Sequence, residues 1–162
     1  MQDLPQRKKI RLKNYDYSSN AAYFVTICVK DKHEMLGKIV RATVPGRPQI
    51  ELSQTGKCVD NAINYINKNT KNISIAKYVI MPNHIHAIFL FYGETAGDRG
   101  RSPLQIIIRN IKSYITKQIG YSIWQKSFYD HIIRDEQEYL RVWQYIDENP
   151  AKWEEDKYYN NL

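Results

Sequence analysis

The 162-residue chain lacks the features that mark membrane proteins and disulfide-bonded secreted proteins. It has only two cysteines, Cys28 and Cys58, which form no CxxC pair and are therefore expected to be buried free thiols of a cytoplasmic protein. No apolar run approaches the ~20 residues of a membrane span, and charges stand where a signal peptide would have its apolar core. The length favours one domain over residues 1–162, large enough to bury a core without disulfides.

What the chain has in excess is positive charge and tyrosine, with a net charge of +7 and 13 tyrosines. In proteins that bind single-stranded nucleic acids, lysine and arginine contact phosphates while aromatic rings stack on unpaired bases. Many solvated surfaces are also rich in lysine, so composition favours a nucleic-acid partner without deciding it. Residues 1–14 carry part of this charge, either as a solvated tail or as an arm that contacts phosphates.

The hydrophobic pattern predicts an α+β fold, with helices packed on an antiparallel sheet in a ferredoxin-like or RRM-like arrangement. Pro and Gly residues between two short apolar runs predict a β-hairpin, and the three glycines of residues 93–101 predict a flexible loop. Strands are expected at residues 22–29, 38–40, 49–52, 73–80 and 84–92, helices at residues 53–68, 102–119 and 135–149, and a short extended segment within residues 123–133.

Two of the four histidines, His84 and His86, stand inside an otherwise apolar strand pattern. Side chains alternate between the two faces of a strand, so these histidines should share one face while Ile85 and Ala87 share the other. Two strand steps of roughly 3.3 Å bring the imidazoles close enough to bind one ion. A polar pair in a position where a sheet usually buries Val or Ile predicts a metal site.

The last predicted helix holds a second polar pair. Tyr145 lies at the rim of its apolar stripe, and Asn149 follows one turn later on the same side. Each residue has an ordinary explanation, since tyrosine is common at helix edges and Asn149 precedes Pro150, where a helix would end. Combined with the histidine pair and the basic composition, they suggest a reactive hydroxyl beside a metal ligand.

These segments carry a resemblance to a known family. His84-Ile85-His86 resembles the histidine–hydrophobe–histidine motif of HUH single-strand DNA endonucleases, and residues 78–86 (YVIMPNHIH) are similar to the single-tyrosine transposases of bacterial insertion sequences. Residues 124–134 (WQKSFYDHIIR), followed by residues 145–150 (YIDENP), resemble the REP-associated tyrosine transposases. The likeness covers most of the chain, from about residue 15 to residue 153.

The resemblance implies a metal-dependent endonuclease and strand transferase that cleaves hairpin-associated, single-stranded DNA through a 5′-phosphotyrosine. It implies that His84 and His86 bind Mg²⁺ or Mn²⁺, that Tyr145 is the nucleophile, and that Asn149 is the third ligand, where some members have Gln. Because Asn is one methylene shorter than Gln, Glu138 remains an alternative to Asn149 as the third ligand. Zinc remains an alternative metal. The basic residues expected to contact DNA are Arg7, Lys8, Lys9, Arg11, Arg109, Lys112, Lys117 and Arg141.

Several alternatives stay open in the sequence. Tyr114 competes as nucleophile because it lies on a basic amphipathic helix with Gln118 four residues later. A non-enzymatic single-strand nucleic-acid-binding protein, or an inactive domesticated relative, would have the same fold. The sequence does not decide between a monomer and a homodimer, and no role for His131 follows from it.

Overall fold

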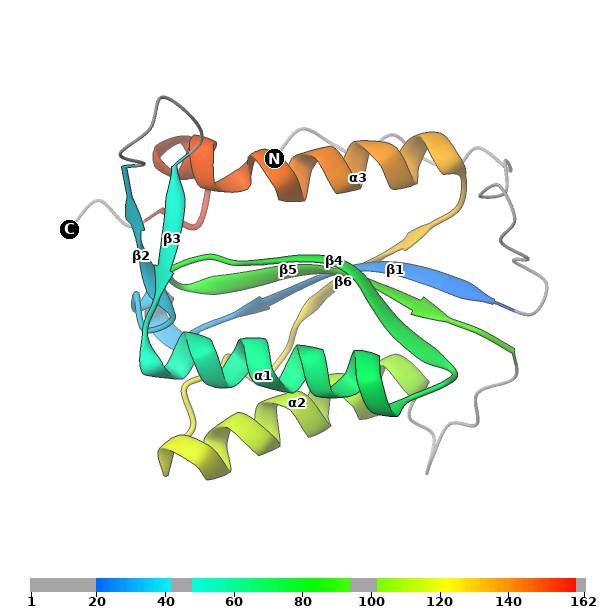
Figure 1. The fold of residues 1–162 in the computed structure, drawn as a ribbon, viewed down its shortest axis with the longest axis horizontal. Coiled ribbons are helices and arrows are strands. Elements are labelled where there is room, and N and C mark those ends of the chain that lie inside the picture. Colours follow the sequence, from blue (N-terminus) through cyan, green and yellow to red (C-terminus); the bar gives the residue numbers. More distant parts are fainter. Residues whose placement is uncertain (1–19, 42–47, 94–101, 160–162) are drawn as a thin grey trace.

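A four-stranded antiparallel sheet forms the centre of the computed structural model, which describes residues 20–41, 48–93 and 102–159 (Figure 1). Its strands are β1 (Ala21–Cys28), β4 (Ile73–Ile80), β5 (His84–Phe91) and β6 (Tyr129–Ile133), and their order across the sheet is β4-β5-β1-β6. The extended segment expected within residues 123–133 is thus a paired edge strand, β6, beside β1.

Helices cover both faces of this sheet (Figure 1). Helices α1 (Gln54–Asn69) and α2 (Pro103–Ile119) pack together on one face, and α3 (Glu136–Glu148) lies on the other. The elements of this sheet and of its α1/α2 face follow the order β1-α1-β4-β5-α2-β6 along the chain. That order and the order of the strands are those of a ferredoxin-like fold. The predicted α+β class is confirmed.

The remaining elements surround one end of the sheet. A separate hairpin of β2 (Gly37–Val40) and β3 (Gln49–Leu52) occurs where the Pro/Gly turn predicted one. A short 3₁₀ turn, η1 (Lys30–Lys32), follows β1, and a longer 3₁₀ segment, η2 (Asn149–Glu155), follows α3. Pro150 therefore ends the α-helix as expected, but the chain continues in a tighter helix rather than leaving the fold.

Local capping explains where the helices begin. The Ser53 hydroxyl accepts a hydrogen bond from the Gly56 amide at the start of α1. At the start of α2, Ser102 and Gln105 form a reciprocal capping box, and Pro103 occupies the first turn. Asp135 caps α3 through the amide of Glu138.

The alternation of side chains along the strands divides the core into two layers. On β5, Ile85, Ala87 and Phe89 join the large cluster beneath α1 and α2, whereas Ile88 joins the smaller cluster beneath α3. His84 and His86 have the same strand parity as Ile88 and therefore belong to the α3 face. The expected division of β5 between histidines and apolar residues is confirmed.

Some expectations fall outside the described residues or differ from them. The basic residues of 1–14 and all but one residue of the 93–101 loop lie outside the described ranges. Both cysteines are free but only half-buried. Among the described residues, no helix is both long and apolar enough to cross a membrane.

Candidate metal and tyrosine site

The two histidines of β5 meet beneath the last helix. Both His84 and His86 are completely buried, and their Nε2 atoms lie 3.0 Å apart. Two nitrogens that bind one ion at about 2.1 Å, at roughly a right angle, would be about 3 Å apart. The two Nε2 atoms therefore have the spacing of neighbouring ligands of one metal ion.

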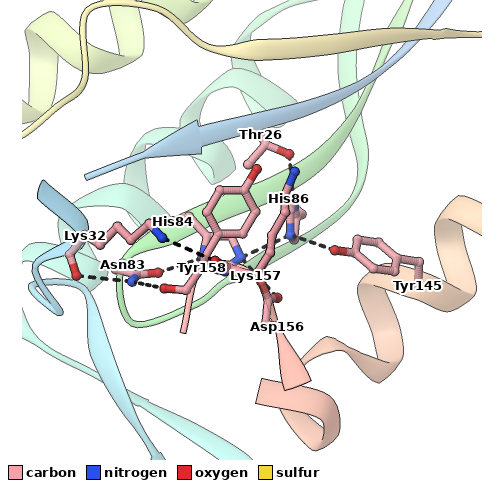
Figure 2. Close-up of polar contacts among 9 residues, drawn as sticks. All are labelled: Thr26, Lys32, Asn83, His84, His86, Tyr145, Asp156, Lys157 and Tyr158. Atoms are coloured by element: carbon pink, nitrogen blue, oxygen red, sulfur yellow. Dashed lines mark hydrogen bonds and ion pairs between the residues drawn. The ribbon is translucent and has the colours of Figure 1, made fainter. Parts of the chain in front are cut away.

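The outer nitrogen of each ring is held by a polar side chain (Figure 2). His86 Nδ1 lies 2.8 Å from the Thr26 hydroxyl on β1, and His84 Nδ1 lies 2.8 Å from Oδ1 of Asn83. The Asn83 amide nitrogen donates to the carbonyls of Lys32 and Tyr158, which orients the amide so that its oxygen accepts the proton of His84 Nδ1. The lone pair of His84 is thereby left on Nε2, which faces His86.

Burial keeps both imidazoles neutral. It lowers the pKa of His84 to about 3, against a smaller raising effect from the neighbouring Asn149 amide. The pKa of His86 is also well below its ordinary value because of burial and the neighbouring His84. A neutral imidazole with one nitrogen hydrogen-bonded elsewhere is the form of histidine that binds metals.

Tyr145 reaches the histidine pair from α3 (Figure 2). Its hydroxyl oxygen lies 3.4 Å from His86 Nε2, and its ring packs edge-on against Phe24 of β1 with centroids 5.9 Å apart. Burial raises the pKa of Tyr145 to about 12, and the carboxylate of Asp156 adds to this rise, while a hydrogen bond with Asn149 opposes it. The hydroxyl is therefore neutral in the structure and directed at the metal-binding nitrogens.

Asn149 is the first residue of η2 and is almost fully buried. Its side chain lies beside both His84 and Tyr145 and influences the pKa of each. No hydrogen bond of ordinary geometry reaches its Oδ1 atom from any described residue. A buried amide oxygen without a partner is costly unless something else binds it, so this position suits a metal ligand.

Asp156 is a further candidate ligand that the sequence did not reveal. Its side chain is 3% exposed, and its Oδ2 lies 3.8 Å from His84 Nε2 without a hydrogen-bond partner among the described residues. Ligand atoms of His84, His86 and Asp156 lie within 4.8 Å of one another. Asp156 follows the irregular end of η2, where no periodicity indicates which way a side chain points.

This donor set fits a divalent cation. Two neutral imidazole nitrogens face each other, and two buried oxygens, from Asn149 and Asp156, lack partners within the described chain. Carboxylate and amide oxygens with imidazole suit Mn²⁺ and also Mg²⁺. Zinc, the alternative metal, also binds two histidines and one carboxylate.

A second tyrosine, Tyr158, lies at the site and was not expected. Its ring stacks on His84 with centroids 4.4 Å apart. Its hydroxyl, however, lies on the Thr26 side of the ring, near Cys28, and burial raises its pKa (Figure 2). Tyr145 rather than Tyr158 directs its hydroxyl at an Nε2 atom.

Comparisons with known proteins find similar sequences and a similar fold. An uncharacterised protein of Haemophilus influenzae is 33% identical over 174 residues, covering 94% of this chain and 93% of that protein. The REP-associated tyrosine transposase of Escherichia coli is 30% identical over 86 residues, which cover 52% of this chain and 48% of that protein. No family model matches the sequence.

A solved structure, of a REP-associated tyrosine transposase bound to a REP hairpin, has the same fold. It superimposes with a TM-score of 0.61 and 21% identity, over 89% of this chain and 74% of that one. The chain is thus similar in fold to one REP-associated tyrosine transposase and, over about half its length, similar in sequence to another. The segments that carry the resemblance, residues 78–86 and 145–150, are also those that meet at the site.

The other candidates from the sequence lie elsewhere. Tyr114, the competing nucleophile, is exposed on α2, which covers the opposite face of the sheet from the histidines (Figure 1). The carboxylate of Glu138, the alternative ligand, binds His131 at 2.5 Å and the backbone amide of Arg134. Neither residue therefore belongs to the group around His86.

The basic residues that were expected to contact DNA are spread over several surfaces. Arg109 and Lys117 are exposed on α2, and Arg141 is exposed on α3. The Lys112 ammonium instead donates to the carbonyls of Gln125 and Ser127, at 2.7 and 3.0 Å. The four basic residues of the N-terminal segment lie outside the described ranges.

Proposed function

We propose that this protein is a metal-dependent, single-stranded DNA endonuclease and strand transferase that uses Tyr145 as its nucleophile. The observation that carries the proposal is the meeting of three groups from two distant parts of the chain. The Tyr145 hydroxyl of α3 lies 3.4 Å from His86 Nε2, which lies 3.0 Å from His84 Nε2 on the same strand. A hydroxyl beside a metal-binding pair is the arrangement that metal-assisted phosphoryl transfer needs.

His84 and His86 would hold the metal, Mg²⁺ or Mn²⁺, with Asn149 and Asp156 supplying oxygen ligands. The bound metal would withdraw charge from the scissile phosphate and orient it for in-line attack. The high pKa of Tyr145, about 12, makes the free phenol a weak nucleophile at neutral pH. Positioning by α3 and loss of the phenolic proton during attack must therefore supply the reactivity.

The covalent step conserves the energy of the cleaved bond. The Tyr145 oxygen attacks the phosphorus and forms a new P–O bond, while the bond to the 3′ oxygen of the preceding nucleotide breaks. That oxygen takes up a proton and leaves as a free 3′-hydroxyl, and the 5′ phosphate stays on the tyrosine. Because a phosphodiester is retained, a second 3′-hydroxyl can reverse the step and rejoin strands without ATP.

We propose that the substrate is DNA with a hairpin next to the cleavage site. The solved relative was bound to a REP hairpin, and the net charge of +7 favours a nucleic-acid partner. The site lies on the sheet face and includes buried groups that would contact one phosphate at a time. An unpaired strand would reach such a site more readily than a duplex.

The decisive experiment is capture of the covalent intermediate. Purified protein is incubated with labelled hairpin DNA bearing single-stranded flanks and Mn²⁺, and protein–DNA adducts are separated on a denaturing gel. We expect an adduct that Tyr145→Phe abolishes, and peptide mapping should find the label on Tyr145. Tyr158→Phe and Tyr114→Phe are the matched controls, and each should retain the adduct.

Two results would contradict the proposal. An adduct that persists in Tyr145→Phe and disappears in Tyr114→Phe or Tyr158→Phe would assign the chemistry to another tyrosine. Binding of the same DNA in EDTA, with no adduct in Mn²⁺, Mg²⁺ or Zn²⁺, would indicate a non-enzymatic nucleic-acid-binding protein or an inactive relative.

A further inference from the structure

The edge strand β6 presents polar and aromatic side chains on the same face as the metal-binding histidines. Tyr129 of β6 pairs with Thr26, the residue that holds His86, and His131 pairs with Phe24. Because alternate residues share a face, Tyr129 and His131 lie on the α3 side of the sheet. The strip they form is continuous with the site across β1.

Helix α3 leaves part of this face available. On this face, α3 packs on β4 and β5, towards the edge of the sheet opposite β6. Tyr129 is 42% exposed, and the ammonium of the exposed Lys157 lies 6.0 Å from its ring and 4.9 Å from the ring of Tyr158. A cation between two aromatic rings is the combination found where proteins bind unpaired nucleotides.

His131 adds a hydrogen-bonding group with a fixed orientation. Its Nε2 is bound to the buried carboxylate of Glu138, which also accepts from the backbone amide of Arg134. A buried carboxylate holds the ring in one position. The His131 side chain is 27% exposed, so its other ring nitrogen, Nδ1, is the polar atom that remains to contact a ligand.

Phe24 connects this strip to the nucleophile. Its ring packs edge-on against Tyr129, with centroids 6.4 Å apart, and edge-on against Tyr145, with centroids 5.9 Å apart. A base stacked on Tyr129 would therefore belong to a nucleotide close to the phosphate at Tyr145. The exposed ring, the neighbouring cation and this proximity all favour a single strand of DNA as the occupant.

We propose that Tyr129, Lys157 and His131 form a binding site for the unpaired DNA strand next to the cleaved phosphate. Tyr129 stacks on a base, Lys157 contacts a phosphate, and His131 hydrogen-bonds to a base or sugar. The site deepens the proposed endonuclease function and rests on it for the identity of the strand. Its binding can nevertheless be measured without metal and without chemistry.

The test measures binding in EDTA by fluorescence anisotropy. Two probes are used, a labelled oligothymidylate strand and a labelled blunt DNA hairpin without flanks. Tyr129→Ala should weaken strand binding by about 5- to 150-fold, the range expected for one base–aromatic stack, and should leave hairpin binding unchanged. Tyr129→Phe keeps the ring and should bind the strand within about twofold of the unmodified protein.

Two further variants complete the design. Tyr65→Ala removes another exposed tyrosine, 67% exposed on α1 and thus on the opposite face of the sheet, and should leave both affinities unchanged. Lys157→Gln should reduce the slope of log affinity against log salt by about 0.7 for the strand. Circular dichroism melting of each variant checks that the fold is retained.

The proposal would be overturned if the unmodified protein did not bind the strand, or if Tyr129→Ala matched Tyr65→Ala. It would also be overturned if Tyr129→Ala weakened hairpin and strand binding equally, or if Tyr129→Phe lost as much affinity as Tyr129→Ala. Failure of the covalent-adduct experiment with a positive anisotropy result would remove the nuclease proposal and leave this strand-binding site standing.

Discussion

The Tyr145 hydroxyl and His86 Nε2 lie 3.4 Å apart although 59 residues separate them in the sequence. The packing of α3 on the sheet creates this contact. Val142 and Ile146 are completely buried against a cluster that includes Phe24 and Ile88 of the sheet. An ion pair between Lys77 of β4 and Asp147, 2.8 Å long, adds a polar contact between the sheet and the same helix.

Loosening this packing should therefore impair both stability and adduct formation. Ile146→Ala removes a fully buried side chain and should lower the free energy of unfolding by about 2–5 kcal/mol. Adduct yield should fall even where the protein is still folded, because Tyr145 is no longer held at the histidines. Urea unfolding measures the first effect and the gel assay the second.

The matched control lies on the same helix. Leu140 is 57% exposed, so Leu140→Ala should change stability by less than about 0.5 kcal/mol and leave the adduct intact. Equal effects of the two substitutions would mean that buried packing of α3 does not hold the tyrosine in place.

Removal of the oxygen ligands should separate the roles of Asn149 and Asp156. At a Mn²⁺ concentration about a hundred times the Kd, metal should stabilise the protein by about 2.7 kcal/mol, and His84→Ala should abolish this. Asp156→Ala should weaken Mn²⁺ binding by at least about tenfold, and by more than Asn149→Ala, because a carboxylate brings a charge to a divalent cation. Calorimetric titration and thermal unfolding both report the change.

Glu155→Ala provides the control for charge. Glu155 is the neighbour of Asp156 in the sequence and is exposed. Its substitution removes one negative charge, as Asp156→Ala does, but removes no side chain from the metal site. If Glu155→Ala weakened metal binding as much as Asp156→Ala, the effect would be general electrostatics rather than ligation.

The half of the site that follows regular periodicity could be predicted from sequence. His84 and His86 share a face because strand residues alternate, and Tyr145 and Asn149 share a side because one helical turn separates them. That the two halves meet depends on which sheet face α3 covers. No local pattern in residues 135–149 specifies that face.

The site residues that the sequence did not predict lie in irregular backbone. Asp156 and Tyr158 follow η2, where neither a period of two nor a period of 3.6 applies. Tertiary contacts place them: Trp153 is buried beside His84, and the Tyr158 carbonyl accepts a hydrogen bond from Asn83. Lys112 was predicted to contact DNA from its helix position alone, which does not reveal that backbone carbonyls bind its ammonium.

The hydrogen bond from Thr26 should tune metal affinity without contacting the metal. Thr26 is buried and holds Nδ1 of His86, so Thr26→Val keeps the shape of the side chain and removes the hydroxyl that contacts His86 and Tyr158. Loss of such an orienting partner typically lowers metal affinity by about 10- to 100-fold. Calorimetric titration with Mn²⁺ should show this fall, while binding of hairpin DNA in EDTA should stay unchanged.

A suitable control is Ser74→Ala, which removes an exposed hydroxyl from a strand of the same sheet, 3.4 Å from the Tyr92 hydroxyl. It should leave Mn²⁺ affinity unchanged. Equal metal affinity in Thr26→Val and the unmodified protein would show that the orientation of His86 does not depend on Thr26.

The buried histidines should also make the metal-free protein sensitive to acid. Because burial lowers the pKa of His84 to about 3 and that of His86 well below 6.5, both stay neutral in the folded state while the unfolded chain takes up protons below about pH 6.5. The unfolded state then binds more protons, so stability falls as pH decreases from about 6.5 towards about 3. Each histidine contributes at most about 1.4 kcal/mol per pH unit.

Urea midpoints measured in EDTA from about pH 7 to about pH 4 test this dependence. His86→Gln removes one of the two groups and should flatten the decline, whereas His33→Gln, which replaces an exposed histidine in a loop, serves as the control. Excess Mn²⁺ should raise the midpoint without removing the decline, because the folded ligand nitrogens stay unprotonated to about pH 3 while the unfolded histidines still take up protons. A midpoint that declined equally in His86→Gln and in the unmodified protein would assign the acid sensitivity to other groups.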